Sequence, residues 1–104
     1  MMTRLTAAAL AAAALALAGT AGAQDAEDLA EMRVKSKAAG LISPEEAIEK
    51  ALAAKPGTVT DADLDRSFKK YYYEVEIIDA QGDEWEVKID AKTGEVRKVR
   101  KDWF

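Results

Sequence analysis

The hydrophobic pattern of this chain changes its period near residue 57, and this change constrains the fold more than any other feature of the sequence. Before it, apolar residues recur at helical spacing, and after it they alternate with polar residues up to residue 100. A period of about 3.6 predicts a helix, whereas a period of two predicts strands with one buried and one solvent face. The sequence therefore predicts an α+β fold in which a helix precedes an antiparallel sheet.

The expected helix has clear start and stop signals. Ser43 supplies a capping hydroxyl, Pro44 suits the first helical position, and Glu46 occupies the acidic position of a capping box. The pair Pro56-Gly57 ends the helix. Its inward face consists of Ile48, Ala51, Leu52 and Lys55, with Ala47 and Ala54 beside them. The small alanine side chains allow a sheet to approach this helix closely.

Three to four strands are expected after the helix, at residues 58–66, 71–78, 84–90 and 95–100. The third is the clearest, because Trp85, Val87 and Ile89 alternate with charged residues. The inner faces of the first two strands are expected to carry Thr60, Ala62, Leu64 and Arg66, and then Tyr71, Tyr73, Val75 and Ile77. The predicted architecture is one main helix packed on an antiparallel β-meander.

Residues 24–40 are charged and carry only a weak apolar stripe. Leu29 and Met32 are one helical turn apart, and Glu31 precedes Lys35 by four residues, as in helical ion pairs. Asp25 is available as a cap. The segment is interpreted either as an additional short helix or as a charged linker.

The first 23 residues have the pattern of a secretory signal peptide. Arg4 precedes an apolar run of Leu and Ala at residues 5–18, and Ala21 and Ala23 supply the small residues of a cleavage site. The run is shorter than the roughly 20 residues that span a bilayer. No Cys follows the cleavage site, so lipid attachment there is not expected. We therefore predict a periplasmic or secreted protein with no membrane span after cleavage.

The composition after cleavage excludes several functions. Removing 23 residues and their single charge from this chain leaves 81 residues with 14 basic and 19 acidic side chains, a net charge of −5. This balance is opposite to that of nucleic-acid-binding domains. The chain contains no His and no Cys, which removes Cys nucleophiles, His bases and the usual zinc ligand sets. The sequence therefore predicts a protein that is not an enzyme and has no cofactor.

Alternating acids in the first strand resemble the start of a calcium-binding loop. Asp61, Asp63 and Asp65 would occupy positions 1, 3 and 5 of an EF-hand loop. The remainder does not fit, because Arg66 stands where glycine is needed and Tyr72 where a bidentate Glu is needed. The solvent face of a strand explains the pattern better, and no resident metal is expected.

Two groups of residues are candidates for partner binding. One is the solvent face of the first two strands, and the other is the C-terminal tail at residues 102–104. The candidate contacts are Asp61, Asp63, Asp65, Tyr72, Glu74, Glu76, Trp103 and Phe104. The preferred hypothesis is a module that binds a protein partner with a basic surface. The alternative is an extracytoplasmic domain that senses cations or small ligands with its acidic face.

The order of these segments resembles that of the PepSY family over residues 41–101. The resemblance rests on the helix entry ISPEEA (42–47), the helix exit ALAAKPG (51–57), the strand YYEVE (72–76) and the segment WEVKIDAKTGEV (85–96). The family includes propeptide domains of thermolysin-type metallopeptidases. The resemblance implies a cystatin-like fold and a role in restraining or modulating an extracytoplasmic peptidase or envelope protein.

We predict that the exported protein begins at Gln24 and carries no lipid, because cleavage after Ala23 satisfies the small-residue rule. Intact mass spectrometry of protein recovered from outside the cytoplasm measures both properties. A mature start before Leu17 would contradict the assignment.

Overall fold

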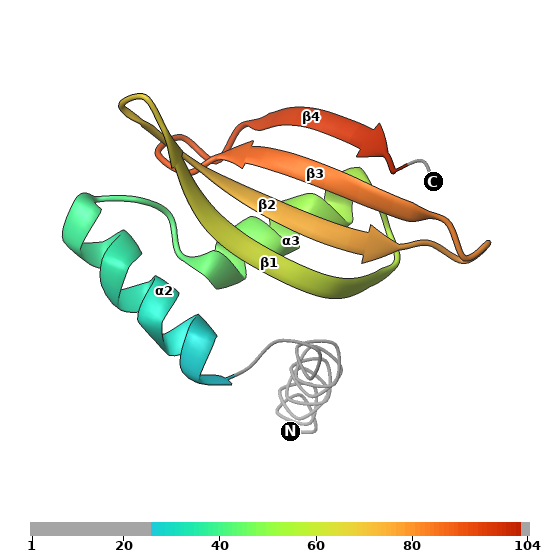
Figure 1. Ribbon diagram of the computed structural model, residues 1–104, viewed down its shortest axis with the longest axis horizontal. Helices are drawn as coiled ribbons and strands as arrows, with labels where there is room; N and C mark the ends of the chain where they lie inside the picture. Colours follow the sequence, from blue (N-terminus) through green and yellow to red (C-terminus); the bar gives the residue numbers. More distant parts are fainter. Residues whose placement is uncertain (1–25, 103–104) are drawn as a thin grey trace, which may run out of the picture.

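The computed structural model describes residues 26–102 and shows two helices packed on a four-stranded antiparallel sheet (Figure 1). The elements are α2 (Ala26–Ala39), α3 (Pro44–Ala54), β1 (Thr58–Ser67), β2 (Lys70–Ile78), β3 (Glu84–Asp90) and β4 (Val96–Lys101). The strand order is β1-β2-β3-β4, so each strand pairs with its neighbours in sequence. The predicted α+β meander is confirmed. The predicted signal peptide and the tail residues Trp103 and Phe104 lie outside the described residues.

Helix α3 begins as its sequence predicts. The hydroxyl of Ser43 accepts a hydrogen bond from the backbone N–H of Glu46 at 3.1 Å, and Pro44 occupies the first turn. Ala47 and Ala51 are completely buried against the sheet. Because alanine has the smallest side chain that still favours a helix, the helix axis lies close to the strands.

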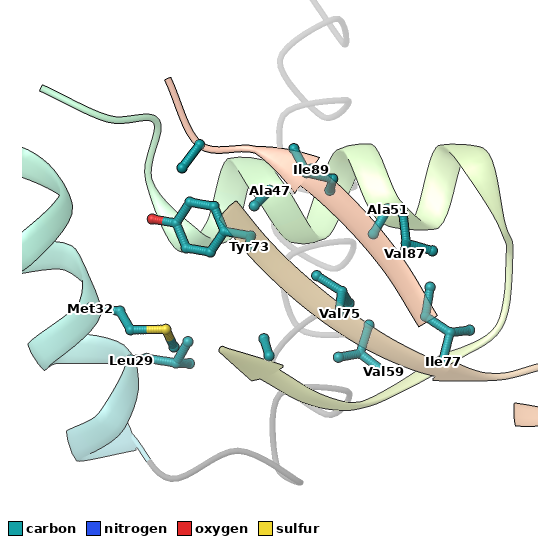
Figure 2. Packing of buried hydrophobic residues seen from close by; sticks show 12 residues of the cluster. Leu29, Met32, Ala47, Ala51, Val59, Tyr73, Val75, Ile77, Val87 and Ile89 are labelled. Carbon is teal, nitrogen blue, oxygen red and sulfur yellow. The ribbon is translucent and has the colours of Figure 1, made fainter. Parts of the chain in front are cut away.

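The core lies between α3 and the two central strands (Figure 2). Its largest fully buried side chains are Tyr73, Val75 and Ile77 from β2, and Val87 and Ile89 from β3. These residues occupy alternate positions, as the predicted period of two requires. Val75 lies directly opposite Val87 in the register, so the two central strands contribute paired side chains to one apolar layer.

The ends of the inner face are less buried than the sequence predicts. Trp85 and Tyr71 were both expected in the core, and both are half-buried. Trp85 lies where α3 has already ended, and the ammonium of Lys55 covers its ring at 3.9 Å from the ring centre. The Trp85 indole donates to a carboxylate oxygen of Asp79 at 2.8 Å. A charged cluster therefore replaces apolar packing at this end of the core.

Strand β1 contains an irregularity that the alternation alone does not reveal. Val59 pairs with Ile77 and Asp61 pairs with Glu76, so Thr60 is an extra residue in a β-bulge. The expected placement of Thr60 on the inner face is wrong, because the bulge puts Val59 in the core at 3% exposure. Ala62 is buried as predicted.

The connection between α3 and β1 requires a glycine. A Cβ atom at Gly57 would lie 2.4 Å from the backbone oxygen of Ile78 and 2.6 Å from a side-chain carbon of Ile77. Contacts this short cannot be tolerated without movement of the backbone. Gly57 therefore lets the chain leave the helix in close contact with the end of β2.

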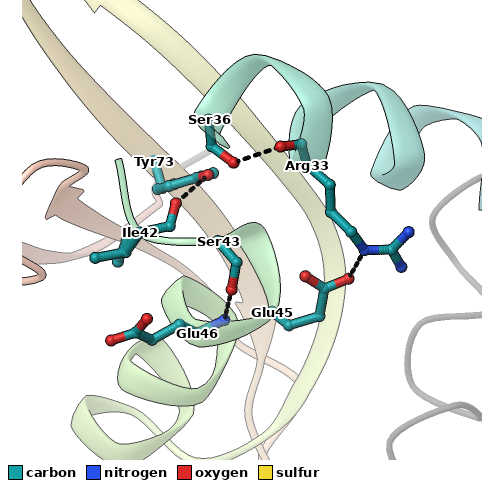
Figure 3. Close-up of polar contacts among 7 residues, drawn as sticks. All are labelled: Arg33, Ser36, Ile42, Ser43, Glu45, Glu46 and Tyr73. Carbon is teal, nitrogen blue, oxygen red and sulfur yellow. Dashed lines mark hydrogen bonds and ion pairs between the residues drawn. The ribbon is translucent and has the colours of Figure 1, made fainter. Parts of the chain in front are cut away.

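Residues 26–39 form a docked helix, which decides between the two interpretations of the N-terminal segment. Leu29 and Met32 belong to the core and are each 8% exposed. The guanidinium of Arg33 forms an ion pair with Glu45 of α3 (Figure 3). The small apolar stripe of α2 thus extends the core (Figure 2), and Met32 lines one hollow together with Ala62 of β1.

Tyr73 links the central strand to the loop between the helices (Figure 3). Its ring is fully buried, and its hydroxyl donates to the backbone carbonyl of Ile42 at 2.8 Å. Burial raises the pKa of the Tyr73 hydroxyl, which keeps it a neutral donor. The side chain of Ser36 in α2, itself buried, lies next to this hydroxyl. One phenol therefore helps to position both helices.

We predict that Tyr73→Phe destabilises the domain by about 1–2 kcal/mol, because it leaves the partly buried carbonyl of Ile42 without the hydroxyl donor. Urea denaturation monitored by circular dichroism gives the free energy of unfolding. The control is Tyr72→Phe on the opposite face, which should change stability by less than about 0.5 kcal/mol. Equal effects of the two substitutions would contradict this role of the hydroxyl.

Candidate interaction face

The sheet face opposite α3 brings the predicted acidic contacts together. Ala62 of β1 and Val75 of β2 are buried, so alternation turns their neighbours outward. In the register, Asp61 lies opposite Glu76 and Asp63 lies opposite Glu74. We define these four residues and Asp65 as the acidic ladder. Five carboxylates from two adjacent strands thus occupy one continuous surface.

Burial and the charges of neighbouring carboxylates raise the pKa values of several acids on this face. Burial, a hydrogen bond to Asp61 and the charges of Asp61, Asp65 and Asp28 raise the pKa of Asp63 to about 6. Partial burial and the charge of Glu86 are the main causes that raise the pKa of Glu74. The ladder is therefore electrostatically strained at neutral pH.

A third carboxylate of the ladder, Glu76, also has a raised pKa. The pKa of Glu76 is raised by partial burial and then by the charge of Asp61 across the strand pair. Asp102, Glu86 and Glu84 add smaller contributions of the same sign. Repulsion at this point therefore extends from β1 across to β3.

Basic side chains on the outer face come from β3 and β4, and Lys88 of β3, which lies opposite Glu74, offsets part of the rise in the pKa of that carboxyl. Arg100 donates to Glu86 at 2.8 Å, and the Lys88 ammonium lies 4.9 Å from the ring centre of Tyr72. Within residues 26–102, no salt bridge reaches a carboxylate of the ladder. Charge is therefore unevenly distributed across the sheet, with its negative side on β1 and β2.

Two other carboxylates contrast with the ladder, because they hold turns together. Burial acts to raise the pKa of Asp79, but hydrogen bonds from Trp85, Asp83 and Gln81 and the nearby charge of Lys55 lower it overall. Its two oxygens accept these three hydrogen bonds at 2.8–3.0 Å. This carboxylate therefore joins the β2–β3 turn to the end of α3.

Asp90 has the corresponding role at the β3–β4 turn. Hydrogen bonds from the backbone N–H groups of Lys92 and Thr93, at 2.9 and 3.2 Å, lower the pKa of Asp90. Gly94 has a φ of 81°, which favours glycine, and its N–H donates to the Asp90 carbonyl at 2.7 Å. The segment DAKTGE is therefore a turn whose side chains satisfy its own backbone.

The same turn also anchors the helical layer to the sheet. The backbone N–H of Ala91 donates to the carbonyl of Tyr71 at 3.0 Å, and the carbonyl of Ala91 accepts from Ile42 at 2.8 Å. The fully buried Ala91 therefore connects β2 with the entry to α3.

The described residues offer no arrangement typical of a metal centre or a membrane span. Between residues 26 and 102, no three potential ligands are grouped so that they could hold a metal ion. No helix in this part of the chain is long and apolar enough to cross a bilayer.

The family assignment follows from the same segment that forms the fold. Residues 41–100 match the family model described as "Peptidase propeptide and YPEB domain". The chain belongs to the PepSY family. Domains of this family are propeptide-like and non-catalytic, and they are typically extracytoplasmic. Helix α3 and all four strands lie within the PepSY match, or within one residue of its end, whereas α2 precedes it.

Two individual proteins are similar to this PepSY domain. The uncharacterized protein YkoJ of Bacillus subtilis (strain 168) is 46% identical over 61 residues, which cover 59% of this chain and 36% of YkoJ. A crystal structure of a candidate lipoprotein of Clostridium difficile 630 has a TM-score of 0.56 and 33% identity, covering 61% of this chain and 41% of that one. The chain thus spans less than half the length of either protein.

One cluster of surface residues was not predicted from the sequence. Residues 67–70 were expected only to connect two strands, but the structure exposes Phe68 almost completely among several basic side chains. The available signal was the run RSFKK at 66–70, in which an aromatic residue interrupts four polar or basic ones.

We predict that the domain becomes less stable as pH rises from about 4 to about 6, the interval between the ordinary and folded pKa values of Asp63. A carboxyl whose folded pKa is raised is charged more easily in the unfolded chain, so ionisation favours unfolding. Asp63→Asn should flatten this slope and raise the thermal midpoint at pH 7. Glu49→Gln, on the exposed face of α3, is the matched control. Thermal unfolding at several pH values tests this, and an unchanged slope in Asp63→Asn would contradict it.

Proposed function

We propose that this protein is an exported, non-catalytic binding module that docks its acidic ladder on a basic surface of an extracytoplasmic protein. The partner class is a peptidase or another envelope protein, whose activity the module restrains or modulates. The proposed contacts are the ladder carboxylates and Tyr72, which lies between Asp65 and Lys88 on the same face.

The observation that carries this proposal is the register of like charges. Asp63 opposite Glu74 and Asp61 opposite Glu76 are unfavourable pairs that solubility alone does not require. Acids that only maintain solubility can be scattered over a surface. Arginine or lysine side chains of a partner would relieve this repulsion when they bind. The complex would therefore contain favourable charge pairs that the free domain lacks.

Three further observations support the proposal. The family description refers to peptidase propeptides, which are segments that accompany a peptidase. The sequence lacks the His and Cys residues on which many catalytic sites depend. The signal-peptide pattern at residues 1–23 supports export to a compartment where such partners would be met.

We predict that replacing Asp63, Glu74 and Glu76 together by Ser slows association with the partner on the order of tenfold at low salt, because electrostatic attraction mainly affects the rate of encounter. The partner is first isolated by cross-linking in the cell envelope, and rates are then measured by surface plasmon resonance. Raising the salt concentration should reduce the difference between parent and variant.

The matched control is the triple variant of Glu27, Glu31 and Glu49 to Ser, which removes the same charge from exposed positions on the helices. It should associate as fast as the parent. If both triple variants behave alike, net charge rather than the ladder governs binding, and the proposed site is wrong. A thermal shift caused by divalent cations alone, in the absence of a protein partner, would instead support the sensing alternative.

A further inference from the structure

The turn between β1 and β2 carries a residue that neither the fold nor the proposed function explains. Phe68 and Lys69 form a two-residue turn between the paired residues Ser67 and Lys70. The Phe68 side chain is 96% exposed, and the backbone φ is 58°. In hairpins of this length, a positive φ at the first turn residue strongly favours glycine. Phe68 therefore combines an unfavourable backbone conformation with a fully exposed apolar ring.

This combination indicates that Phe68 contacts something other than its own domain. Glycine at position 68 would relieve the backbone strain and remove the exposed ring, so the stability of the hairpin does not account for Phe68. Strained residues persist mainly where their side chain has a function. The turn projects at one end of the molecule (Figure 1), where it is accessible to a large surface.

Basic side chains surround the exposed ring. Phe68 lies on an open concave surface together with Ser67 and Tyr72. The basic residues on the same surface are Arg66, Lys69, Lys70 and Lys88. We define these four residues and Phe68 as the hairpin tip. The tip therefore joins one exposed apolar ring to four basic residues that line the same open surface.

Two of these cations are held against aromatic rings of the sheet. The guanidinium of Arg66 lies 5.7 Å from the ring centre of Tyr71, and the ammonium of Lys88 lies 4.9 Å from that of Tyr72. Such contacts restrict long side chains that would otherwise move freely. Arg66 and Tyr71 share the α3 side of the sheet, whereas Lys88 and Tyr72 share the opposite side, so the β1–β2 turn has basic side chains behind it on both sides of the sheet.

We propose that the hairpin tip docks on an anionic membrane surface. The Phe68 ring enters the boundary between headgroups and acyl chains, and the adjacent Lys69 and Lys70 contact the phosphates of the headgroups, with Arg66 and Lys88 farther from the surface. Interfacial binding depends on buried apolar area and on attraction to anionic lipids, and the tip supplies both. Each basic side chain near such a surface increases partitioning about fivefold.

Size and charge favour a membrane over a protein as the occupant of the tip. A specific protein interface buries about 800 Å² on each partner, which is more than one projecting turn can provide. A lipid surface requires no matching shape, and long lysine side chains adapt to it. The acidic ladder lies farther along the same hairpin, and an anionic surface repels it, so the domain is expected to bind end-on.

The test is cosedimentation of the processed protein with vesicles of phosphatidylcholine alone or mixed equally with phosphatidylglycerol. We expect binding to the mixed vesicles at low salt, little binding to phosphatidylcholine, and loss of binding at high salt. Lys69→Gln with Lys70→Gln should reduce partitioning at least tenfold. The charge-matched control is Arg100→Gln with Lys101→Gln, because these residues lie at the opposite end of the sheet, next to Trp85 and Glu86.

The Phe68 variants separate insertion from simple charge attraction. Phe68→Gly should weaken vesicle binding severalfold while it preserves or raises the thermal midpoint, because glycine suits the backbone conformation. Phe68→Trp should retain binding, and its fluorescence should shift to the blue when the ring enters the membrane. Val34→Ser, which removes another exposed apolar side chain, is the control and should bind normally.

Three outcomes would overturn the proposal. The first is equal binding to the two kinds of vesicle. The second is unchanged binding in both the Phe68→Gly and the double Lys→Gln variants. The third is absence of vesicle binding combined with loss of the cross-linked protein partner in these variants, which would assign the tip to protein recognition. Vesicle binding is measured without any protein partner, so failure here leaves the proposed role of the acidic ladder unaffected.

Discussion

Between β1 and β2, Ala62 lies opposite Val75 and Asp63 lies opposite Glu74, and this register links burial on one sheet face to charge on the other. A shift by one residue would expose the core residues and bury the carboxylates, so the alternative register is strongly excluded. The same pairing ends at Ser67 and Lys70 and so leaves Phe68 in the turn. The core, the acidic ladder and the hairpin tip therefore depend on a single strand pairing.

Carboxylates of one chemical kind have opposite roles in this domain because their surroundings differ. Asp79 and Asp90 accept several N–H hydrogen bonds, which stabilise the charged form and lower both pKa values. Burial and then the charges of other acids raise the pKa values of Asp63 and Glu74. Acidification therefore weakens the turns and relieves the ladder. The stability of the fold at neutral pH reflects the balance between these two groups.

Local signals in the sequence were sufficient to predict most of the fold. The cap at Ser43, the stop at Pro56-Gly57 and the alternation in β2 and β3 each act within a few residues, and the structure confirms all three. Alternation also predicted which acids share the outer face. These features depend on backbone geometry, which is the same in every protein, and so they can be read without knowledge of the tertiary structure.

The features that were missed depend on contacts between distant segments. The bulge at Thr60 is visible only from its pairing with β2, and the half-burial of Trp85 follows from where α3 ends. Docking of α2 rests on two apolar residues, Leu29 and Met32, whose pattern alone is too weak to exclude a linker. Exposure of Phe68 could not be predicted either, because aromatic residues in hairpins are more often buried.

The separation between the two charged surfaces of the β1–β2 hairpin determines whether they can work together. From Phe68 to Asp61 the chain runs seven residues along a strand, or about 23 Å at roughly 3.3 Å per residue. This exceeds the screening length of about 8–10 Å at physiological salt. In the proposed end-on orientation, Asp61 and Glu76 would scarcely sense an anionic membrane and would remain available to a basic protein. Asp65, only three residues from Phe68, lies close enough to interact with both the anionic membrane and the basic protein. Its charge would oppose membrane docking and attract the protein partner.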